Sequence, residues 1–210
     1  MTLSGQVALI TGAGRPGGLG AAIAARLAAA GARIVLHDRG ALSGDLAPAH
    51  GIGGRDDLEA TADTLRATGA EVVTVTGDLL DERVITDIVA SADSAFGRLD
   101  ILVNNAGIGY LFGPLTDITA AHLDAVLGVN LRAPVLLTRD AARLMIRGGR
   151  GGRVINIASQ AGKSGFAFAV AYSASKHGLI GLTRAAAVTV VVMPRAAKAP
   201  NTRAAPALIP

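Results

Sequence analysis

The sequence predicts one α/β domain with a doubly wound parallel sheet flanked by helices, on three observations. Short apolar runs typical of β-strands alternate along the chain with longer helical patterns. The strand runs are apolar throughout, as strands are when helices cover both faces of a sheet. Right-handed connections between parallel strands then carry the chain to both sides of the sheet. Ligands bind such sheets beyond the carboxyl ends of the strands, so we expect functional residues directly after each strand.

The predicted elements follow in a regular order. Strands are expected at residues 7–11, 33–37, 71–76, 99–104 and 153–158. Helices are expected at residues 19–30, 56–68, 81–96, 119–144 and 171–187. Gly31, Gly69 and Gly97 stand directly after three of these helices, where glycine commonly ends a helix. The segment 39–55, rich in Gly, Ala and Pro, is predicted to be a surface loop in which His50 is solvated.

Composition excludes several kinds of protein. The chain has 210 residues, of which 50% are hydrophobic and 17% charged, as expected of a globular domain with its own core. The absence of cysteine excludes disulfides, thiolate metal sites and a cysteine nucleophile. The four histidines show no metal-ligand spacing, so we expect no metal site. Neither a signal peptide nor an apolar run of about 18 residues is visible, which favours a cytoplasmic protein without a membrane span.

The charged residues are distributed unevenly along the chain. The net charge is +4, and the last acidic residue is Asp140, so every charged residue after it is basic. Such a block can mark a segment that binds nucleic acid. Here the basic residues stand singly among Ala, Gly and Pro, without interleaved aromatic residues to stack on bases. We therefore expect no nucleic-acid partner.

A glycine-rich segment between the first strand and the first helix indicates a dinucleotide site. The segment TGAGRPGGLG runs from Thr11 to Gly20. Glycines let a backbone turn tightly against a pyrophosphate, and the following helix offers free N–H groups to the phosphates. Asp38 stands 18 residues after Gly20, where an acid binds the adenosine ribose and repels a 2′-phosphate, which favours NAD. Arg15 and Arg39 are able to pair with that phosphate, so NADP is the alternative, and Asp38 as a turn cap is another interpretation.

Further candidates for the dinucleotide site follow the third and fourth strands. Asp78 and Leu79 come directly after the third strand. The segment NNAG, which ends in Asn105, Ala106 and Gly107, comes at the end of the fourth. Because parallel strands end at the same edge of the sheet, we expect these residues to lie near the glycine segment.

Four polar residues form a second group of motifs. Asn130 lies in GVNL within the long helix, and Ser159 follows the fifth strand. Tyr172 and Lys176 begin and end the segment YSASK, so they share one face of a helix, where an ammonium favours the phenolate form of a tyrosine. Taken in order with the glycine segment and NNAG, these motifs resemble those of the short-chain dehydrogenase/reductase family over residues 3–187.

The resemblance implies a Rossmann-like fold that holds a nicotinamide dinucleotide. The family's TGxxxGxG segment is matched with two extra residues, Pro16 and Gly17. The residues implied for cofactor binding are Gly12, Arg15, Gly18, Leu19, Gly20, Asp38, Asp78, Leu79, Asn105, Ala106, Gly107, Tyr172 and Lys176.

The resemblance also implies an oxidoreductase that acts on a secondary alcohol or ketone, including a 3-oxoacyl compound. Tyr172 is then the general acid/base, and Lys176 also holds the nicotinamide ribose. Ser159 hydrogen-bonds the carbonyl oxygen, and Asn130 anchors a water in the proton relay. Tyr110 is a candidate for the substrate side. Homo-oligomers are common in the family, so a homo-oligomer is a candidate state of this chain.

The resemblance ends near residue 187. Residues 188–210 form a basic tail rich in Pro and Ala, so we divide the chain into a dinucleotide-binding and catalytic domain at 1–187 and a tail at 188–210. The apolar run at 188–193 is interpreted as a strand remnant after a deletion, or the tail as a shifted reading frame. On either interpretation the last edge strand is missing, and we expect lower stability and activity than in a longer relative. The alternative function is an impaired NAD-binding fragment without turnover.

Overall fold

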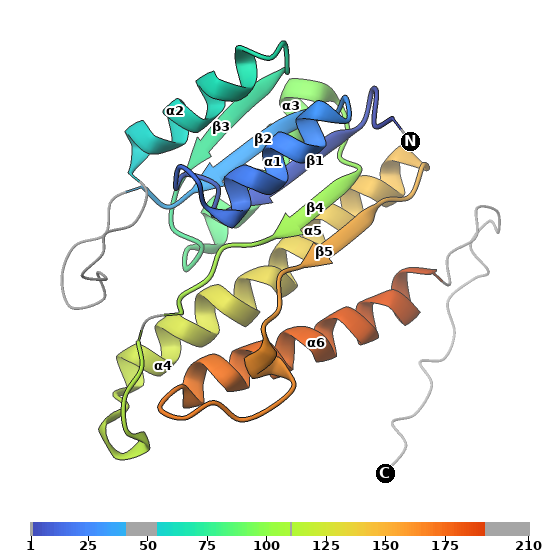
Figure 1. The fold of residues 1–210 in the computed structure, drawn as a ribbon. Helices are drawn as coiled ribbons and strands as arrows, with labels where there is room; N and C mark the ends of the chain where they lie inside the picture. The colour runs from blue at the N-terminus through green and yellow to red at the C-terminus, as the bar shows by residue number, and fades with distance from the viewer. Residues whose placement is uncertain (1, 41–53, 110, 192–210) are drawn as a thin grey trace, which may run out of the picture.

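The computed structural model describes residues 2–40, 54–109 and 111–191 (Figure 1). His50, Tyr110 and the tail from residue 192 lie outside the described residues, as does most of the predicted loop at 39–55. The expectations for these segments stay predictions.

Five parallel strands form one sheet in the order β3-β2-β1-β4-β5. The strands are β1 (Val7–Thr11), β2 (Arg33–Asp38), β3 (Val72–Thr76), β4 (Ile101–Asn104) and β5 (Arg153–Asn156). The order reverses between β1 and β4, which creates the switch point where ligands bind in doubly wound sheets. In the described part of the chain, β3 and β5 are the outer strands. The predicted fold class is confirmed.

Within the described ranges, six α-helices connect and extend the sheet. They are α1 (Leu19–Ala29), α2 (Arg55–Arg66), α3 (Glu82–Phe96), α4 (Ala120–Leu127), α5 (Ala133–Gly148) and α6 (Val170–Val191). Three short turns are η1 (Leu115–Asp117), η2 (Gly128–Arg132), which is a π-helical turn, and η3 (Gln160–Gly162). The helix predicted at 119–144 is therefore α4, η2 and α5 in succession. Residues 188–191 continue α6 and do not form a strand, whereas the rest of the run at 188–193 lies outside the described residues.

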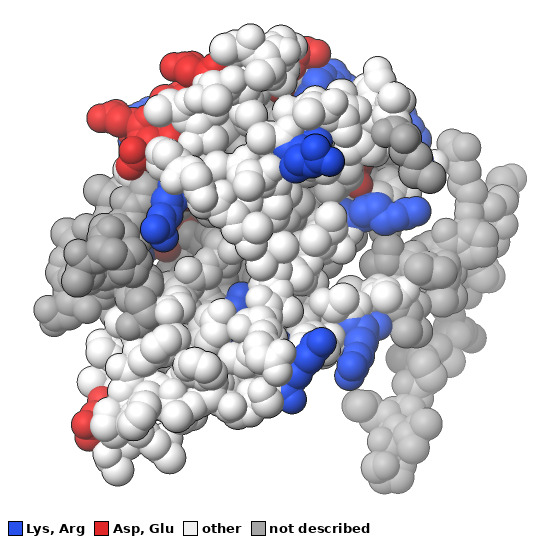
Figure 2. Space-filling model, in the orientation of Figure 1, with Lys and Arg blue, Asp and Glu red and all other residues white. Residues whose placement is uncertain are grey.

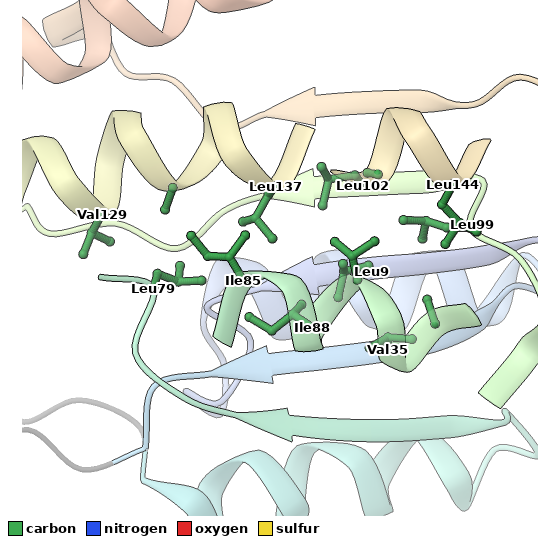
Figure 3. Packing of buried hydrophobic residues seen from close by; sticks show 14 of the residues in the cluster. Leu9, Val35, Leu79, Ile85, Ile88, Leu99, Leu102, Val129, Leu137 and Leu144 are labelled. Carbon is green, nitrogen blue, oxygen red and sulfur yellow. The ribbon is translucent and has the colours of Figure 1, made fainter. Parts of the chain in front are cut away.

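Both faces of the inner strands β2, β1 and β4 are buried, which explains why these strands are apolar, whereas Ile155 on the outer strand β5 is exposed. On one face Leu9, Val35 and Leu102 pack against α3 and α5, as Figure 3 shows with Ile88 and Leu137. On the other face the alternate strand residues pack against α1 and α2. In Figure 1, α4 and the start of α6 extend beyond the carboxyl ends of the strands. They border the place where the sheet predicts a ligand.

One helical stretch has the length and apolarity of a membrane span, whereas the sequence analysis expected none. It is Ala120–Gly148, whose most apolar window has a mean hydropathy of 1.2. Leu137 and Leu144 of this stretch lie in the core against the sheet, and 44% of the window is buried. Core helices meet the same criterion of length and composition, so packing against the sheet accounts for this apolarity.

A buried carboxylate joins the starts of β1 and β4. Oδ2 of Asp100 accepts the backbone N–H of Val7 at 2.8 Å. The Arg98 guanidinium donates to both oxygens of Asp100, at 2.8 Å from Nε and 2.6 Å from Nη2. The backbone of Asp100 also bonds to Val7 and to Arg153 at the start of β5. Asp100 therefore links the amino ends of three strands: its carboxylate and N–H bind β1, and its backbone carbonyl binds β5.

Replacing this carboxylate by a neutral amide tests its contribution to the fold. We expect Asp100→Asn to lower the free energy of unfolding by about 1–3 kcal/mol, because the amide cannot accept the charged fork of Arg98. Urea denaturation measures the loss. The matched control is Asp93→Asn, which breaks an exposed ion pair with Arg147 and should cost under about 0.5 kcal/mol. Equal losses in the two variants would contradict this role of Asp100.

Candidate active site

The glycine-rich turn after β1 packs tightly against the segment after β4. Gly12 has a φ of +66°, and a Cβ placed on it would lie 2.7 Å from the Cα of Ala106. A Cβ on Gly20 would collide with the carbonyl oxygen of Gly12 and lie 2.6 Å from Nδ2 of Asn105. Two of the predicted motif glycines are thus required by close packing between the ends of β1 and β4.

Asn105 and Thr11 hold this packing in place. Nδ2 of Asn105 donates to the carbonyl oxygens of Thr11 at 2.9 Å and Gly12 at 2.8 Å. Oγ1 of Thr11 accepts the backbone N–H groups of Asn105 and Ala106, both at 3.2 Å. Asn105 therefore shapes the loop, and its amide protons are already used. Thr11 was not among the predicted site residues, although it directly precedes the first motif glycine.

The two extra residues of the glycine segment form an outward turn. Gly17 has a φ of +70° with open space around it, and the N–H of Gly18 donates to the Arg15 carbonyl at 2.9 Å. Gly18 is the N-cap of α1 and has no side chain to accept the N–H groups of the first turn, at Leu19 and Gly20. The start of α1 is therefore able to offer backbone donors to phosphate oxygens. With the two extra residues in this turn, Gly12 and Gly20 still pack against the segment after β4.

Asp38 at the end of β2 faces the same loop. Its Oδ2 accepts the N–H of Gly14 and its Oδ1 the N–H of Arg39, both at 2.7 Å. A Cβ on Gly14 would lie 2.9 Å from the Cβ of Asp38, so glycine is required here as well, which the sequence analysis did not single out. Nη2 of Arg39 pairs with Asp78 at 2.7 Å. The carboxylate of Asp38 is thus fixed beside the glycine turn, and Arg39 is engaged elsewhere.

Lys176 is buried on α6, one helical turn after Tyr172. Only 5% of Lys176 is exposed, and its Nζ donates to the carbonyl oxygen of Ile157 at 2.8 Å. Burial lowers the pKa of the Lys176 amine from its ordinary value. The same Nζ lies 5.6 Å from the ring centre of Tyr172. A Cβ placed on Gly107 would lie 3.7 Å from this Nζ, so the NNAG segment passes directly beside the amine.

Asn130 lies in the π-helical turn η2 and is buried. Its Oδ1 accepts the N–H of Ile108 at 2.7 Å, and its Nδ2 donates to the Ile108 carbonyl at 2.9 Å and to Oγ of Ser175 at 3.1 Å. Oγ of Ser175 donates in turn to the carbonyl oxygen of Tyr172 at 2.7 Å. A chain of hydrogen bonds therefore links Asn130, the segment after β4 and the start of α6. π-Turns inside helices are frequent at functional sites.

Ser159 stands on the connection from β5 to α6 and is half-buried. Its Oγ accepts the N–H of Ala161 at 3.2 Å and so caps η3. In the described part of the chain it has no direct hydrogen bond to Tyr172 or Lys176. The structure thus brings Asn130, Tyr172 and Lys176 together at the strand ends and places Ser159 on the segment that leads to them.

Further polar features of the described residues include a hollow and a buried histidine. A hollow of about 190 Å³ lies at the opposite end of the sheet, lined by residues that include Arg98, Asp100 and Arg147. His37 on β2 is buried, its Nε2 lies 3.0 Å from the Gly77 carbonyl, and burial lowers its pKa. Among residues 2–40, 54–109 and 111–191, no three His, Asp or Glu side chains are grouped so as to hold a metal ion.

Comparison with known proteins identifies the family. The family described as short chain dehydrogenase matches residues 6–192. The chain belongs to the short-chain dehydrogenase family. A metagenomic member solved in complex with NADP is 42% identical with a TM-score of 0.78, and the match covers 91% of this chain and 79% of that one. The family membership inferred from the motifs is confirmed.

Two further short-chain dehydrogenases broaden the comparison. Carveol dehydrogenase from Mycobacterium avium, solved in complex with NAD, is 34% identical with a TM-score of 0.83, over 90% of this chain and 67% of that one. Galactitol 2-dehydrogenase from Agrobacterium fabrum is 35% identical over 191 residues, 91% of this chain and 67% of that protein. The chain spans between 62% and 68% of the length of the curated relatives that it matches. The bound dinucleotides of the solved relatives agree with the expected cofactor, NAD with NADP as the alternative.

A methyl group at Gly20 tests the tight packing of the cofactor turn. We expect Gly20→Ala to lower the free energy of unfolding by about 1–3 kcal/mol and to weaken NADH binding, because the Cβ collides with the Gly12 backbone. Thermal denaturation and NADH fluorescence titration measure the two effects. The control is Gly165→Ala, where a Cβ meets nothing within 4 Å. Unchanged NADH affinity in Gly20→Ala would show that the turn is not part of the cofactor site.

Proposed function

We propose that this chain is an NAD(P)-dependent oxidoreductase that transfers a hydride between the nicotinamide and a secondary alcohol or ketone. The observation that carries this proposal is the buried Lys176, held by the Ile157 carbonyl beside the ring of Tyr172. An amine placed in this way lies beside the side chain that would exchange a proton with the substrate, which suits Tyr172 and Lys176 to act together. Residues 1–187 are then the catalytic domain and 188–210 its basic tail.

The cofactor site is proposed to run from the glycine turn to the start of α6. The first turn of α1 binds the phosphates, with Arg15 nearby, and Asp38 binds the hydroxyls of the adenosine ribose. Asp78 and Leu79 border the adenine side. When bound there, the dinucleotide supplies or accepts the hydride. The donor set fits this group, because the glycine turn leaves its backbone open and the Asp38 carboxylate is held in place by Gly14. The remaining contacts are assigned to Gly12, Gly18, Leu19, Gly20, Asn105, Ala106, Gly107, Tyr172 and Lys176.

The catalytic roles are assigned to four side chains. Tyr172 donates its hydroxyl proton to the substrate oxygen during reduction and accepts the alcohol proton during oxidation. Lys176 hydrogen-bonds the nicotinamide ribose beside Tyr172, while Ser159 hydrogen-bonds the substrate oxygen. Both amide protons of Asn130 are used, on Ile108 and Ser175, so a relay water held by Asn130 would bind to its Oδ1.

Asp38 favours NAD over NADP. A carboxylate fixed at this position repels a 2′-phosphate, and the pairing of Arg39 with Asp78 removes one cation that would compensate. Arg15 is exposed and remains able to pair with a phosphate, which is the basis for NADP as the alternative. The proposed partners are this dinucleotide and a small alcohol or carbonyl substrate, with a 3-oxoacyl compound as a candidate. We further propose a cytoplasmic protein that binds neither membranes nor nucleic acid and forms a homo-oligomer.

The second candidate function is dinucleotide binding without turnover. It is favoured by one feature of the fold: in the described part of the chain, the hydrogen bonds that shape the cofactor turn come from the turn itself, from the end of β2 and from the segment after β4. The turn does not depend on α6, so the chain would be able to bind a dinucleotide even with an incomplete substrate side.

Removing the hydroxyl group of Tyr172 separates the two functions. We expect Tyr172→Phe to lower kcat by about 10²–10⁴-fold, because the substrate oxygen loses its proton donor. The Kd for NADH should change less than about twofold, since the ring and its packing remain. Steady-state turnover and NADH titration measure both quantities. Full turnover in Tyr172→Phe would disprove the assigned mechanism, and NADH binding by the parent without turnover on any ketone would support the second candidate.

The charge of Asp38 controls the proposed cofactor preference. We expect Asp38→Asn to lower the ratio of kcat/KM for NAD to that for NADP by about tenfold or more, because the repulsion of the 2′-phosphate is removed. Steady-state kinetics with both cofactors measure the ratio. Asp63→Asn, which neutralises an exposed acid on α2, is the control and should leave the ratio unchanged. An unchanged ratio in Asp38→Asn would exclude Asp38 as the residue that discriminates.

A further inference from the structure

Aromatic side chains gather around Tyr172. The chain contains only four Phe and two Tyr, yet Phe112 lies beside this tyrosine and Phe166 lies beside Phe112. The ring centre of Phe112 lies 5.9 Å from that of Tyr172, edge to face, and 6.2 Å from that of Phe166. These distances are those of favourable aromatic pairs. The three rings form one continuous aromatic surface that ends at the proposed proton donor.

The two phenylalanine rings are exposed rather than used in the core. Phe112 is 47% exposed and Phe166 is 58% exposed. The exposed part of an aromatic side chain does not stabilise the fold, because the hydrophobic effect stabilises only through apolar area that is removed from water. A contiguous apolar patch on the surface is typical of a binding site. We call the rings of Phe112 and Phe166 the aromatic wall.

A local hydrogen bond brings the two segments of the aromatic wall together. Phe112 lies on the connection after β4, and Phe166 lies on the connection that leads into α6. The N–H of Gly113 donates to the carbonyl oxygen of Phe168 at 2.8 Å and joins these connections. Phe168 has a φ of +62°, and no other non-glycine residue in the described ranges has a positive φ. Such backbone strain persists only where the surrounding structure fixes it, so the geometry of the wall is built in.

The two segments that carry the aromatic wall contain no charged residue. Residues 104–116 and 164–175 contain no Asp, Glu, Lys or Arg. In Figure 2 the surface over α4 and the start of α6 is accordingly almost entirely white. An uncharged aromatic surface suits an apolar ligand and offers few partners to a chain of hydroxyl groups or to a phosphate.

We propose that the aromatic wall binds a hydrophobic ring of the substrate, so the substrate class is a secondary alcohol or ketone that carries an aryl or alicyclic ring. This inference rests on the proposed function, because it takes Tyr172 as the group that exchanges a proton with the substrate oxygen. A ring on the wall lies next to Tyr172, and its attached carbonyl group reaches the hydroxyl. Open-chain polyols and sugar ketoses are excluded as good substrates.

The experiment compares an aryl ketone with a small one. The full chain is assayed with NADH on 4-phenyl-2-butanone, 2-butanone and fructose. We expect the aryl ketone to have the highest kcat/KM, and Phe166→Ala to lower that value about tenfold while leaving 2-butanone unchanged. Phe166 is chosen because its ring contacts Phe112 rather than Tyr172. The control is Leu115→Ala, which removes an exposed side chain from the same connection as Phe112 and should leave the ratio of the two ketones unchanged.

The other outcomes are equally decisive. A preference for fructose, an equal loss on both ketones in Phe166→Ala, or no loss on either would overturn the inference. If the chain reduces no ketone, saturation-transfer NMR with 4-phenyl-2-butanone and NADH tests the aromatic wall by itself. Ring signals that disappear in Phe166→Ala but persist in Leu115→Ala would support the wall while the proposed function fails. Absence of ring signals in the parent would overturn the wall.

Discussion

The two hydrogen bonds that the Asn105 amide makes across the ends of β1 and β4 are the interaction on which the rest of the site depends. Both protons of its amide are donated to the backbone of Thr11 and Gly12, at the point where the strand order reverses. From there one segment becomes the cofactor turn and the other passes beside Lys176. Because Gly20 in the first turn of α1 packs against this same amide, the positions of the helix, the turn and the segment after β4 are fixed relative to one another. Loss of the two Asn105 hydrogen bonds would displace the proposed dinucleotide and substrate sides relative to each other.

The proposed substrate side is also held by hydrogen bonds between polar side chains and backbone groups. Asn130 binds both backbone groups of Ile108, and Lys176 binds the carbonyl of Ile157, so each side chain is tied to the backbone just beyond a strand. Burying the Lys176 amine disfavours its charged form, and the single hydrogen bond offsets only part of that cost. A polar group that is buried at such a cost near the carboxyl ends of the strands is typical of a functional site rather than of a core that serves stability.

The elements of the fold were predictable because buried parallel strands leave an apolar signature, and all five strands were placed from it. The contacts between these elements were harder to predict from the sequence. The ion pair between Arg39 and Asp78 joins the ends of two strands whose register no local pattern reveals. The π-helical turn around Asn130 contains one residue more than an α-helical turn, and its amino-acid composition does not distinguish it from the helix on either side. The valine-rich run at 188–191 reads as a strand by propensity, yet it continues a helix already formed by the preceding residues.

The two halves of the site differ in how far the sequence reveals them, for a physical reason. The dinucleotide half is made by close backbone approach, which only glycine permits, so Gly12 and Gly20 mark it in the sequence. The proposed substrate half is made by side chains on two connections, which the Gly113–Phe168 hydrogen bond and the contact between the Phe112 and Phe166 rings bring together. Since Phe112 and Phe166 remain exposed, core packing does not dictate their identity. Residues that the fold does not constrain are the ones able to set which substrate is bound, and for this reason substrate choice needs the three-dimensional arrangement.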